Sequence, residues 1–372
     1  MNPIFNELEL FCKDEVLPFI SSASKNDYPH ELLKRIGELG LFGFNIPKEF
    51  GGSSLPANLN IPINRLLSHY SLALPALYGI HLRASQYFTA LGTEEQKKVY
   101  LTEMAKGKLI STHAYHEKSI RSPKSFTTAI YKKGEKYLLS GTKEWVINAH
   151  NCDFMVVIAR QESNKISDNS PICSAVIVDR NKVGLTISEE YVRRGLKGIS
   201  LSRVTFSNVE IDPSEIIGGE YTCASMTALQ YSPMPLLNFS ARAVGVAESI
   251  AALIKNHILD KPNGHSKKDI ISYKWSEIQM IKESIVAFFE SSLALQKEDN
   301  LTQAHAYRTK VFCTKALVRL VEKASMLCGG AGYASDDYLL IQQLEDAASL
   351  IFIDTPNDIL LTIAGKVELE QV

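Results

Sequence analysis

The chain has 372 residues, of which 45% are hydrophobic and 22% are charged, which is typical of a globular protein with more than one domain. Its formal net charge of −1 at pH 7 gives no electrostatic reason to expect nucleic acid or an anionic membrane surface as a partner. The six cysteines have no metal-ligand spacing, so we expect reduced thiols, no metal site and a cytoplasmic protein. We expect neither a signal peptide nor a membrane span, because the N-terminus lacks a basic region and no apolar run reaches about 18 residues.

Residues 1–110 are predicted to be helical. Apolar residues recur there at spacings of three and four, as they do in residues 32–39. A glycine ends that helix, and residues 41–52 are predicted to form an extended loop. Thr93 followed by Gln96 three residues later predicts a capping box at the start of another helix.

At about residue 111 the apolar pattern changes from helical spacing to alternation. Two segments, 133–135 and 140–142, have the glycine-containing composition of hairpin turns. Several short strands without an intervening helix indicate a small barrel or sandwich. Strands are predicted at residues 126–131, 137–140, 144–148, 154–159, 174–178 and 203–206.

From about residue 225 the pattern returns to long amphipathic helices joined by short loops, which is typical of a four-helix bundle. Helices are predicted at residues 241–258, 270–296, 301–328, 338–350 and 358–365. The predicted fold is therefore α+β and multidomain. It has an N-terminal all-α domain (1–110), a middle β-barrel or sandwich domain (111–224) and a C-terminal four-helix bundle (225–372).

The segment 324–358 contains the most specific motif. Gly329, Gly330 and Gly332 follow an apolar helical run, a second helix comes next, and Asp354 lies in a short break before the last helix. Taken singly, such glycines fit an ordinary helix end and such an aspartate fits a capping residue. In this order and spacing, the segment resembles the C-terminal part of the acyl-CoA dehydrogenase family, which reads GG-x-G-[YF], then R-D-A, then Y-E-G-T.

Two further segments extend this resemblance over essentially the whole chain. Residues 39–52, LGLFGFNIPKEFGG, resemble the family pattern ELGL-x-G-x-x-x-P-x-E-x-GG. Residues 137–149, YLLSGTKEWVINA, resemble the pattern Y-x-L-x-G-x-K-x-W-I-T-N. The family fold has the same order of a helical domain, a β domain and a helical bundle.

The resemblance implies that FAD binds between the β domain and the C-terminal bundle. It also implies a substrate that is an acyl-CoA or acyl-carrier-protein thioester, whose α-proton is removed by a carboxylate. Asp354 falls on the position of that catalytic carboxylate, where the family has glutamate. Trp145 falls where an aromatic ring packs near the flavin, and Ser122 where a hydroxyl contacts the cofactor phosphates. The three glycines of the motif would approach the adenosine part from a partner subunit, in a homodimer or homotetramer.

Other cofactor positions depart from the family pattern. His116 and Ile147 stand where two threonines hydrogen-bond the edge of the flavin ring, and Met326 replaces a glutamine. Glu345 replaces the arginine of R-D-A, and the R-x-x-F-G motif is missing near residues 261–264. We therefore expect FAD to bind weakly or to be absent.

Two other residues allow more than one interpretation. His116 and the adjacent Glu117 could act as an acid–base pair, but His116 could also be a packed or solvated histidine. Arg242, inside an otherwise apolar helix, could face an acidic group of the substrate or form a salt bridge within the bundle.

The sequence predicts a flavin-dependent oxidoreductase that acts on an acyl-CoA or carrier-bound acyl thioester. Because the cofactor positions are altered, we expect a specialised substrate of a biosynthetic pathway. The alternative is a family member without FAD that performs redox-neutral thioester chemistry or serves as a structural partner subunit. Flavin-dependent oxygenation is a third possibility.

Overall fold

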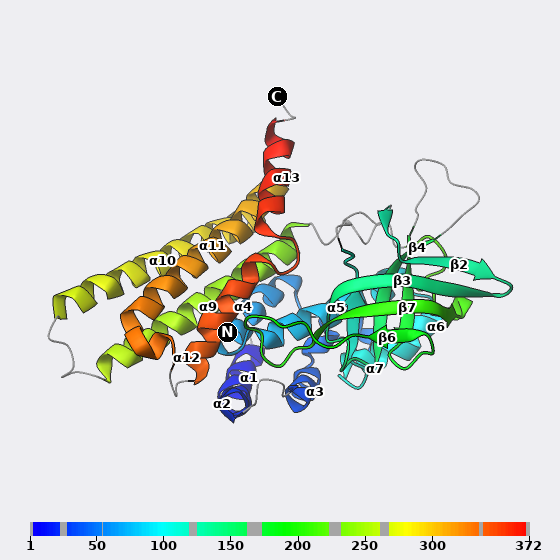
Figure 1. Cartoon of the computed structure of the whole chain (residues 1–372), viewed down its shortest axis with the longest axis horizontal. Coiled ribbons are helices and arrows are strands. Elements are labelled where there is room, and N and C mark those ends of the chain that lie inside the picture. The colour runs from blue at the N-terminus through cyan, green and yellow to red at the C-terminus, as the bar shows by residue number, and fades with distance from the viewer. Residues whose placement is uncertain are drawn as a thin grey trace.

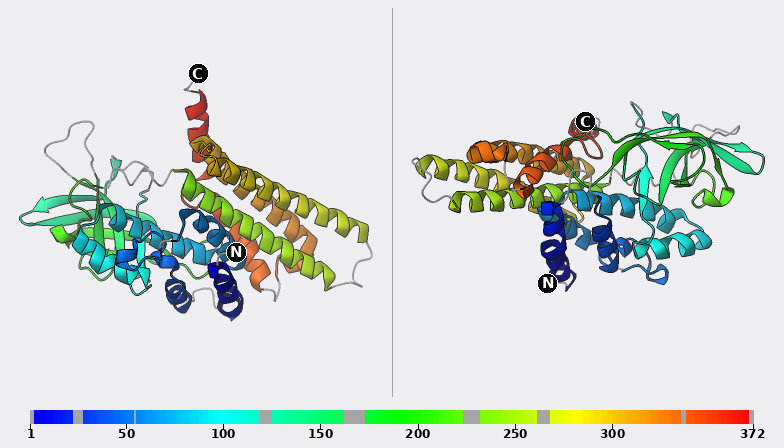
Figure 2. Two further views of the ribbon diagram at one scale, coloured as in Figure 1. Left: turned by 180° about the vertical axis from the view of Figure 1, so that it is seen from behind. Right: turned by 60° about the horizontal axis from the view of Figure 1, so that its bottom comes forward.

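The computed structural model describes residues 3–22, 28–53, 55–118, 125–161, 173–222, 232–260, 268–334 and 338–369. Along the chain, helices are followed by a sheet and then by helices again, which confirms the predicted order. Figure 1 shows the helical bundle and the sheet at opposite ends of the long axis, and Figure 2 shows the N-terminal helices on one side of both. The domain boundaries at 110 and 224 stay a prediction.

The N-terminal part consists of short helices and two longer ones that lie against the rest of the molecule. Thr93 and Gln96 form the predicted capping box: the Thr93 side chain accepts a hydrogen bond from the Gln96 N–H, and the Gln96 side chain accepts one from the Thr93 N–H. The helices are α1 (Pro3–Phe11), a π-helix (Cys12–Val16), α2 (Leu17–Ser22), α3 (His30–Glu38), α4 (Asn60–Tyr70), α5 (Ala73–Leu91), α6 (Glu94–Gln96), a second π-helix (Lys97–Leu101) and α7 (Thr102–Ala105).

The predicted extended loop at 41–52 is instead folded into two short 3₁₀ turns, Leu41–Gly43 and Lys48–Phe50. Local hydrogen bonds to carbonyls three residues earlier hold these turns closed. A Cβ on Gly52 would lie 1.6 Å from the Ile46 carbonyl oxygen, so only glycine permits this close approach of the backbone.

In the residues that the structure describes, the middle part is a seven-stranded sheet with the order β1-β4-β2-β3-β7-β6, in which β5 also pairs with β4. Alternate residues of β4 enter two apolar clusters, one on each face of the sheet, and the first of these clusters includes residues of α5. The strands are β1 (Ser111–Ala114), β2 (Ala129–Lys133), β3 (Lys136–Ile147), β4 (Phe154–Gln161), β5 (Cys173–Asp179), β6 (Leu185–Ile187) and β7 (Leu201–Ile211).

The two predicted hairpin turns have different outcomes. The turn at 133–135 is confirmed, because Lys133 pairs with Lys136 across a tight connection between β2 and β3. The turn at 140–142 is wrong, since β3 continues through it with a shift in register. A Cβ on Gly141 would lie 2.3 Å from Thr128 Cα, so this glycine permits a close backbone approach inside the sheet.

The C-terminal part is a helical bundle in which α9 contacts α10, α11, α12 and, from the N-terminal part, α4. By length and composition α9 could cross a membrane, but 78% of its most apolar window is buried inside the protein, as in a core helix. The helices are α9 (Pro233–Leu259), α10 (Lys268–Lys297), α11 (Gln303–Cys328), α12 (Tyr338–Ala347) and α13 (Asn357–Leu369). Figure 1 shows α13 projecting away from the bundle.

The largest apolar cluster joins the N-terminal helices to the bundle and therefore crosses the predicted domain boundaries. It contains Leu33 and Leu67 from the first part of the chain together with Val244, Leu317 and Leu340 from the last. This shared core fixes α4 and α5 relative to α9, and the candidate site described next depends on that arrangement.

Candidate functional site

Asp354 lies in the turn between α12 and α13 and is half-buried. Its φ of 63° lies in the left-handed region, which non-glycine residues adopt only where the surrounding structure holds them. Its carboxylate interacts electrostatically with two buried cations, Arg242 on α9 and Lys310 on α11. The predicted carboxylate therefore lies beside charged groups of the bundle interior.

Lys310 holds the turn that contains Asp354. It is fully buried, and its Nζ donates hydrogen bonds to the Thr355 carbonyl (3.1 Å) and to Asn357 Oδ1 (2.9 Å). Asn357 in turn donates from Nδ2 to Thr314 Oγ1 at 2.9 Å. Burial lowers the pKa of the Lys310 ammonium to about 8, and the nearby carboxylate partly opposes this shift.

Arg242 lies deeper in the core than Asp354 and only 6% of its surface is exposed. Its Nε donates to Asn64 Oδ1 at 2.7 Å, and its Cζ lies 4.7 Å from the centre of the Phe239 ring. Among the described residues it forms no ion pair within 4.0 Å, so the predicted bundle salt bridge is not present there.

Three of the residues predicted to bind the cofactor lie close together at one end of the sheet. A bulge in β3 between Lys143 and Val146 places Trp145 at a φ of 54° and leaves its side chain 49% exposed. The N–H of Glu144, the residue before it, donates to the His116 carbonyl at 2.8 Å. The carbonyl of Ile147 accepts a hydrogen bond from Thr112 Oγ1 of β1.

Glu117 does not form a pair with His116. It points into the protein and forms an ion pair with Lys143 at 2.9 Å, with 2% and 0% of the two side chains exposed. Burial alone would raise the pKa of Glu117, but Lys143 and hydrogen bonds from Thr127 hold it below its usual value. The possible His116–Glu117 acid–base pair is therefore wrong for Glu117, because its carboxylate is paired with Lys143 in the protein interior.

The glycine motif forms a short 3₁₀ turn after α11, at Gly329–Gly332. Gly329 and Gly330 are exposed, and no atom of the described residues lies within 4 Å of the position that a Cβ would occupy at either residue. A Cβ on Gly332 would lie 2.6 Å from the Ser325 carbonyl oxygen. The first two glycines thus leave their backbone open, whereas the third is needed for packing. Ser122 lies outside the described residues.

Asp346 on α12 joins the bundle to the middle part of the chain. Its Oδ1 accepts a hydrogen bond from the Leu196 N–H at 2.5 Å, and within the described part of the chain its buried Oδ2 has no hydrogen-bond partner. Burial raises the pKa of Asp346 to about 7. This contact fixes the segment that precedes β7 against the helix that leads to Asp354.

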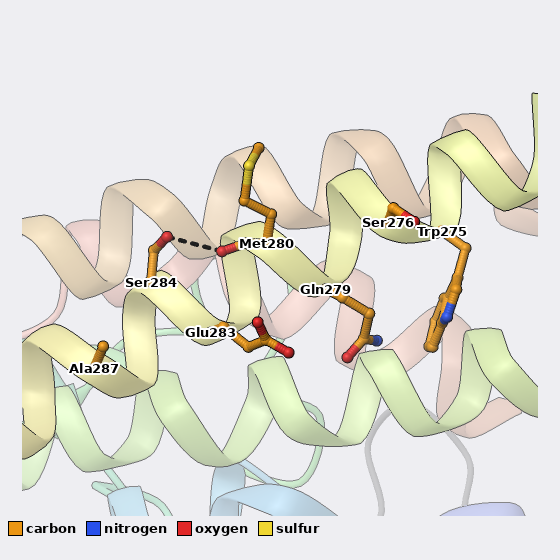
Figure 3. Close-up of a pocket in the computed structure, with 7 residues that line it drawn as sticks. All are labelled: Trp275, Ser276, Gln279, Met280, Glu283, Ser284 and Ala287. Atoms are coloured by element: carbon orange, nitrogen blue, oxygen red, sulfur yellow. Dashed lines mark hydrogen bonds between the residues drawn. The ribbon is translucent and has the colours of Figure 1, made fainter.

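A shallow groove on the bundle surface contains none of these residues. All seven of its lining residues belong to α10, and Figure 3 shows Trp275, Gln279 and Glu283 pointing toward α9. The side chains of Ser284 and Met280 face the other way, and Ser284 Oγ donates a hydrogen bond to the Met280 carbonyl. The groove is therefore separate from the candidate site.

Comparison with known proteins gives matches along nearly the whole chain. Models of the N-terminal, middle and C-terminal domains of acyl-CoA dehydrogenases match residues 4–108, 117–209 and 237–369. The chain belongs to the acyl-CoA dehydrogenase family. The members of this family are oxidoreductases.

Individual relatives of this acyl-CoA dehydrogenase family member have low sequence identity to it, but they align with nearly its whole length. The probable acyl-CoA dehydrogenase YngJ of Bacillus subtilis is 27% identical over 91% of this chain and 89% of its own length. A glutaryl-CoA dehydrogenase of Mycobacterium smegmatis, solved in complex with FADH2, has a TM-score of 0.85 at 18% identity and covers 98% of this chain and 93% of its own. The prolyl acyl carrier protein oxidase AnaB has a TM-score of 0.77 at 19% identity over 97% and 98%.

The candidate cofactor residues keep groups that could contact the flat ring system of FAD, but they lack two groups that would hydrogen-bond its polar edge. The exposed Trp145 indole offers an aromatic surface, and the open backbone of Gly329 and Gly330 leaves room for a close approach. His116 and Ile147 lack the hydroxyl groups that the family's threonines supply. The chain thus offers an aromatic surface for such a ring system but lacks two of the hydroxyl groups that would bind its polar edge.

Sequence reasoning missed Lys310, Asn64 and Asn357, which hold the two charged groups of the acyl-CoA dehydrogenase-like site. Lys310 lies on the same face of α11 as the buried Cys313 and Leu317, three and seven residues further on. A lysine on the apolar face of a helix was the signal that could have identified it.

Proposed function

We propose that this protein is a flavin-dependent oxidoreductase that uses Asp354 to remove the α-proton of an acyl thioester. The observation that supports it most strongly is the turn at Asp354, which Lys310 holds at Thr355 and Asn357 beside the buried Arg242. A base must be held in place to be effective, and a fully buried lysine bound to the backbone provides such a hold.

In this proposal the carboxylate of Asp354 accepts the α-proton as the Cα–Cβ bond of the acyl group becomes a double bond. FAD, when bound, supplies the chemistry of hydride acceptance from Cβ. Trp145 would lie against the flavin, while the backbones of Gly329 and Gly330 would contact the adenosine part of the FAD that is bound in a partner subunit. Lys310 acts as a positioning residue, since its hydrogen bonds go to the turn and not to the reacting atoms.

For the thioester carrier we propose coenzyme A or an acyl-carrier protein, in a specialised biosynthetic reaction in the cytoplasm. The similarity to the prolyl acyl carrier protein oxidase gives the second carrier its support. We further propose a homodimer or homotetramer. The bundle leaves large apolar side chains exposed on α10 and α11, including Tyr273 (66%), Met280 (59%) and Phe312 (39%), which a second copy could cover.

Replacement of Asp354 by asparagine tests the assignment of the base. Asp354→Asn should lower turnover by about 10²–10⁴-fold, because an amide cannot accept the proton, while FAD binding stays unchanged. Asp354→Glu, which keeps the charge beside Arg242 and Lys310, should retain more activity than the asparagine variant.

The matched control is Asp358→Asn, an exposed aspartate in the first turn of α13, which should leave turnover unchanged. If an FAD-loaded Asp354→Asn protein turns over at the wild-type rate, Asp354 is not the base.

His116 and Ile147 stand in place of two threonines of the family, and this change favours a second candidate function. In it, the protein binds no FAD and either performs redox-neutral thioester chemistry or serves as a structural subunit. Asp354→Asn distinguishes the first of these, because it should then abolish a reaction that proceeds without flavin.

A further inference from the structure

Arg242 is a buried charge in the middle of an apolar helix. Its neighbours Ala241, Ala243 and Val244 are fully buried, and α9 packs against α4 at this level. A guanidinium in such surroundings is unfavourable unless other groups compensate its charge. Burial lowers the pKa of Arg242 to about 10, so it stays protonated at neutral pH.

The contacts of Arg242 satisfy only part of its hydrogen-bonding capacity. An arginine has five N–H donors, and in the described part of the chain Nε donates to Asn64 Oδ1 at 2.7 Å. The Phe239 ring, 4.7 Å from Cζ, offers an aromatic face but no strong acceptor. Donors on the two terminal nitrogens remain for a further acceptor.

Gly79 on α5 leaves room for the end of this side chain. A Cβ at Gly79 would lie 2.6 Å from Arg242 Nη2, closer than van der Waals contact allows. Glycine in a helix interior is unfavourable, and here φ is not positive, so no turn explains it. The space at Gly79 is therefore occupied by the guanidinium.

The charges around Asp354 do not balance. Arg242 and Lys310 each carry a positive charge and both interact electrostatically with Asp354, and among the described residues neither forms an ion pair with it within 4.0 Å. Two buried cations thus share one half-buried carboxylate, which leaves one positive charge in excess. An excess charge in a buried site is compensated most directly by an anionic group of a ligand.

We infer that the substrate is a thioester whose short acyl chain ends in a carboxylate, which Arg242 binds. This inference rests on the proposed function and specifies its substrate class. Asp354 would face the thioester end of the acyl group, and Arg242 would accept the far end with the paired N–H groups that suit a carboxylate. The side chains of Arg242 and Phe239 limit the length of the acyl group.

Binding of matched coenzyme A thioesters tests the inference directly. The pairs are succinyl- with butyryl-CoA, glutaryl- with valeryl-CoA, and adipyl- with hexanoyl-CoA, each differing by a terminal carboxylate in place of a methyl group. Affinity is measured by isothermal titration on the purified protein with FAD added and oxygen excluded. In at least one pair we expect the carboxylate to bind about tenfold or more tightly than its neutral partner.

Two variants locate the origin of this preference. Arg242→Met should reduce it to about twofold or less, because the anion loses its partner. The control Arg65→Met, which removes partly exposed ion pairs with Glu248 and Glu290, should keep it. Gly79→Ala should stay folded, since the clash is with the flexible end of a side chain, and should also reduce the preference by displacing the guanidinium. It replaces Arg242→Met if that variant does not fold.

The outcomes separate this inference from the proposed function. If the neutral thioesters bind at least as tightly as the carboxylates in all three pairs, the carboxylate inference is overturned and the proposed function stands. A preference that persists in both Arg242→Met and Gly79→Ala also overturns it. If no thioester of either kind binds, both the inference and the proposed function fail.

Discussion

Lys310 determines the conformation of the turn that carries the candidate base. Its ammonium bonds the backbone at Thr355 and the side chain of Asn357, and these contacts hold Asp354 in its left-handed conformation. A buried lysine is costly because burial disfavours its charged form. The cost is reflected in a pKa near 8, and it makes the stability of the protein depend on pH.

The pH dependence follows from the difference between the two states. In the unfolded chain Lys310 regains a pKa near 10.5, so between about pH 8 and 10.5 the unfolded state binds more protons than the folded state. The titration of Lys310 should therefore increase the free energy of unfolding as pH rises, by at most about 1.4 kcal/mol per pH unit. Urea unfolding at pH 8, 9 and 10 should show that Lys310→Met loses this gain.

Lys315→Met is the control, because Lys315 is an exposed residue of the same helix; its curve should follow the wild type. Parallel curves for wild type and Lys310→Met would show that Lys310 does not titrate in this range.

At the scale of elements, the buried Glu117–Lys143 pair fixes the end of β1 to β3 next to the exposed Trp145. Lys143 Nζ also donates to the Tyr115 carbonyl at 2.9 Å and lies 3.6 Å from the centre of the Phe126 ring. Lys143→Met would leave the Glu117 carboxylate buried without its counter-ion. Removal of one partner of a buried pair typically costs about 3–5 kcal/mol.

Chemical denaturation should show this loss for Lys143→Met. Lys136 lies on the same strand as Lys143, and Lys136→Met, which removes an exposed ion pair with Glu210 of β7, should change stability little. Equal effects of the two substitutions would mean that the buried pair does not stabilise this end of the sheet.

The sequence predicts most helices and strands whose apolar residues are regularly spaced. The prediction is wrong where a glycine permits a close backbone approach and does not form a turn. The long helices of the bundle and the strands β4 and β5 follow from their apolar residues. Gly141 was interpreted as a turn, although it permits β3 to pass close to Thr128. β1 was missed because its sequence, Ser-Thr-His-Ala, is short and lacks an apolar alternation.

The candidate site was only partly predictable for a related reason. The position of Asp354 in a turn followed from local sequence, and its proximity to Arg242 and Lys310 did not, because these residues come from separate helices. The same holds for Glu117, whose partner Lys143 lies on another strand. Local spacing carries no information on which side chains meet across the core.

At the scale of the whole molecule, the N-terminal helices and the bundle share one core, and the sheet carries the exposed Trp145 at its end. A cofactor held between these parts would depend on several weak contacts. Because each missing hydrogen bond to a buried group costs about 1–3 kcal/mol, we expect the replacement of the two family threonines by His116 and Ile147 to weaken FAD binding.

The visible absorption spectrum of the purified protein, recorded with added FAD before and after anaerobic addition of an acyl thioester, tests the central claim most directly. We predict a flavin band that is weak after gel filtration, returns when FAD is added, and is bleached by the thioester. The melting temperature should rise with FAD, because a ligand that binds only the folded state stabilises it. A protein that shows no flavin band, and no shift in melting temperature in excess FAD, would contradict a flavin-dependent oxidoreductase.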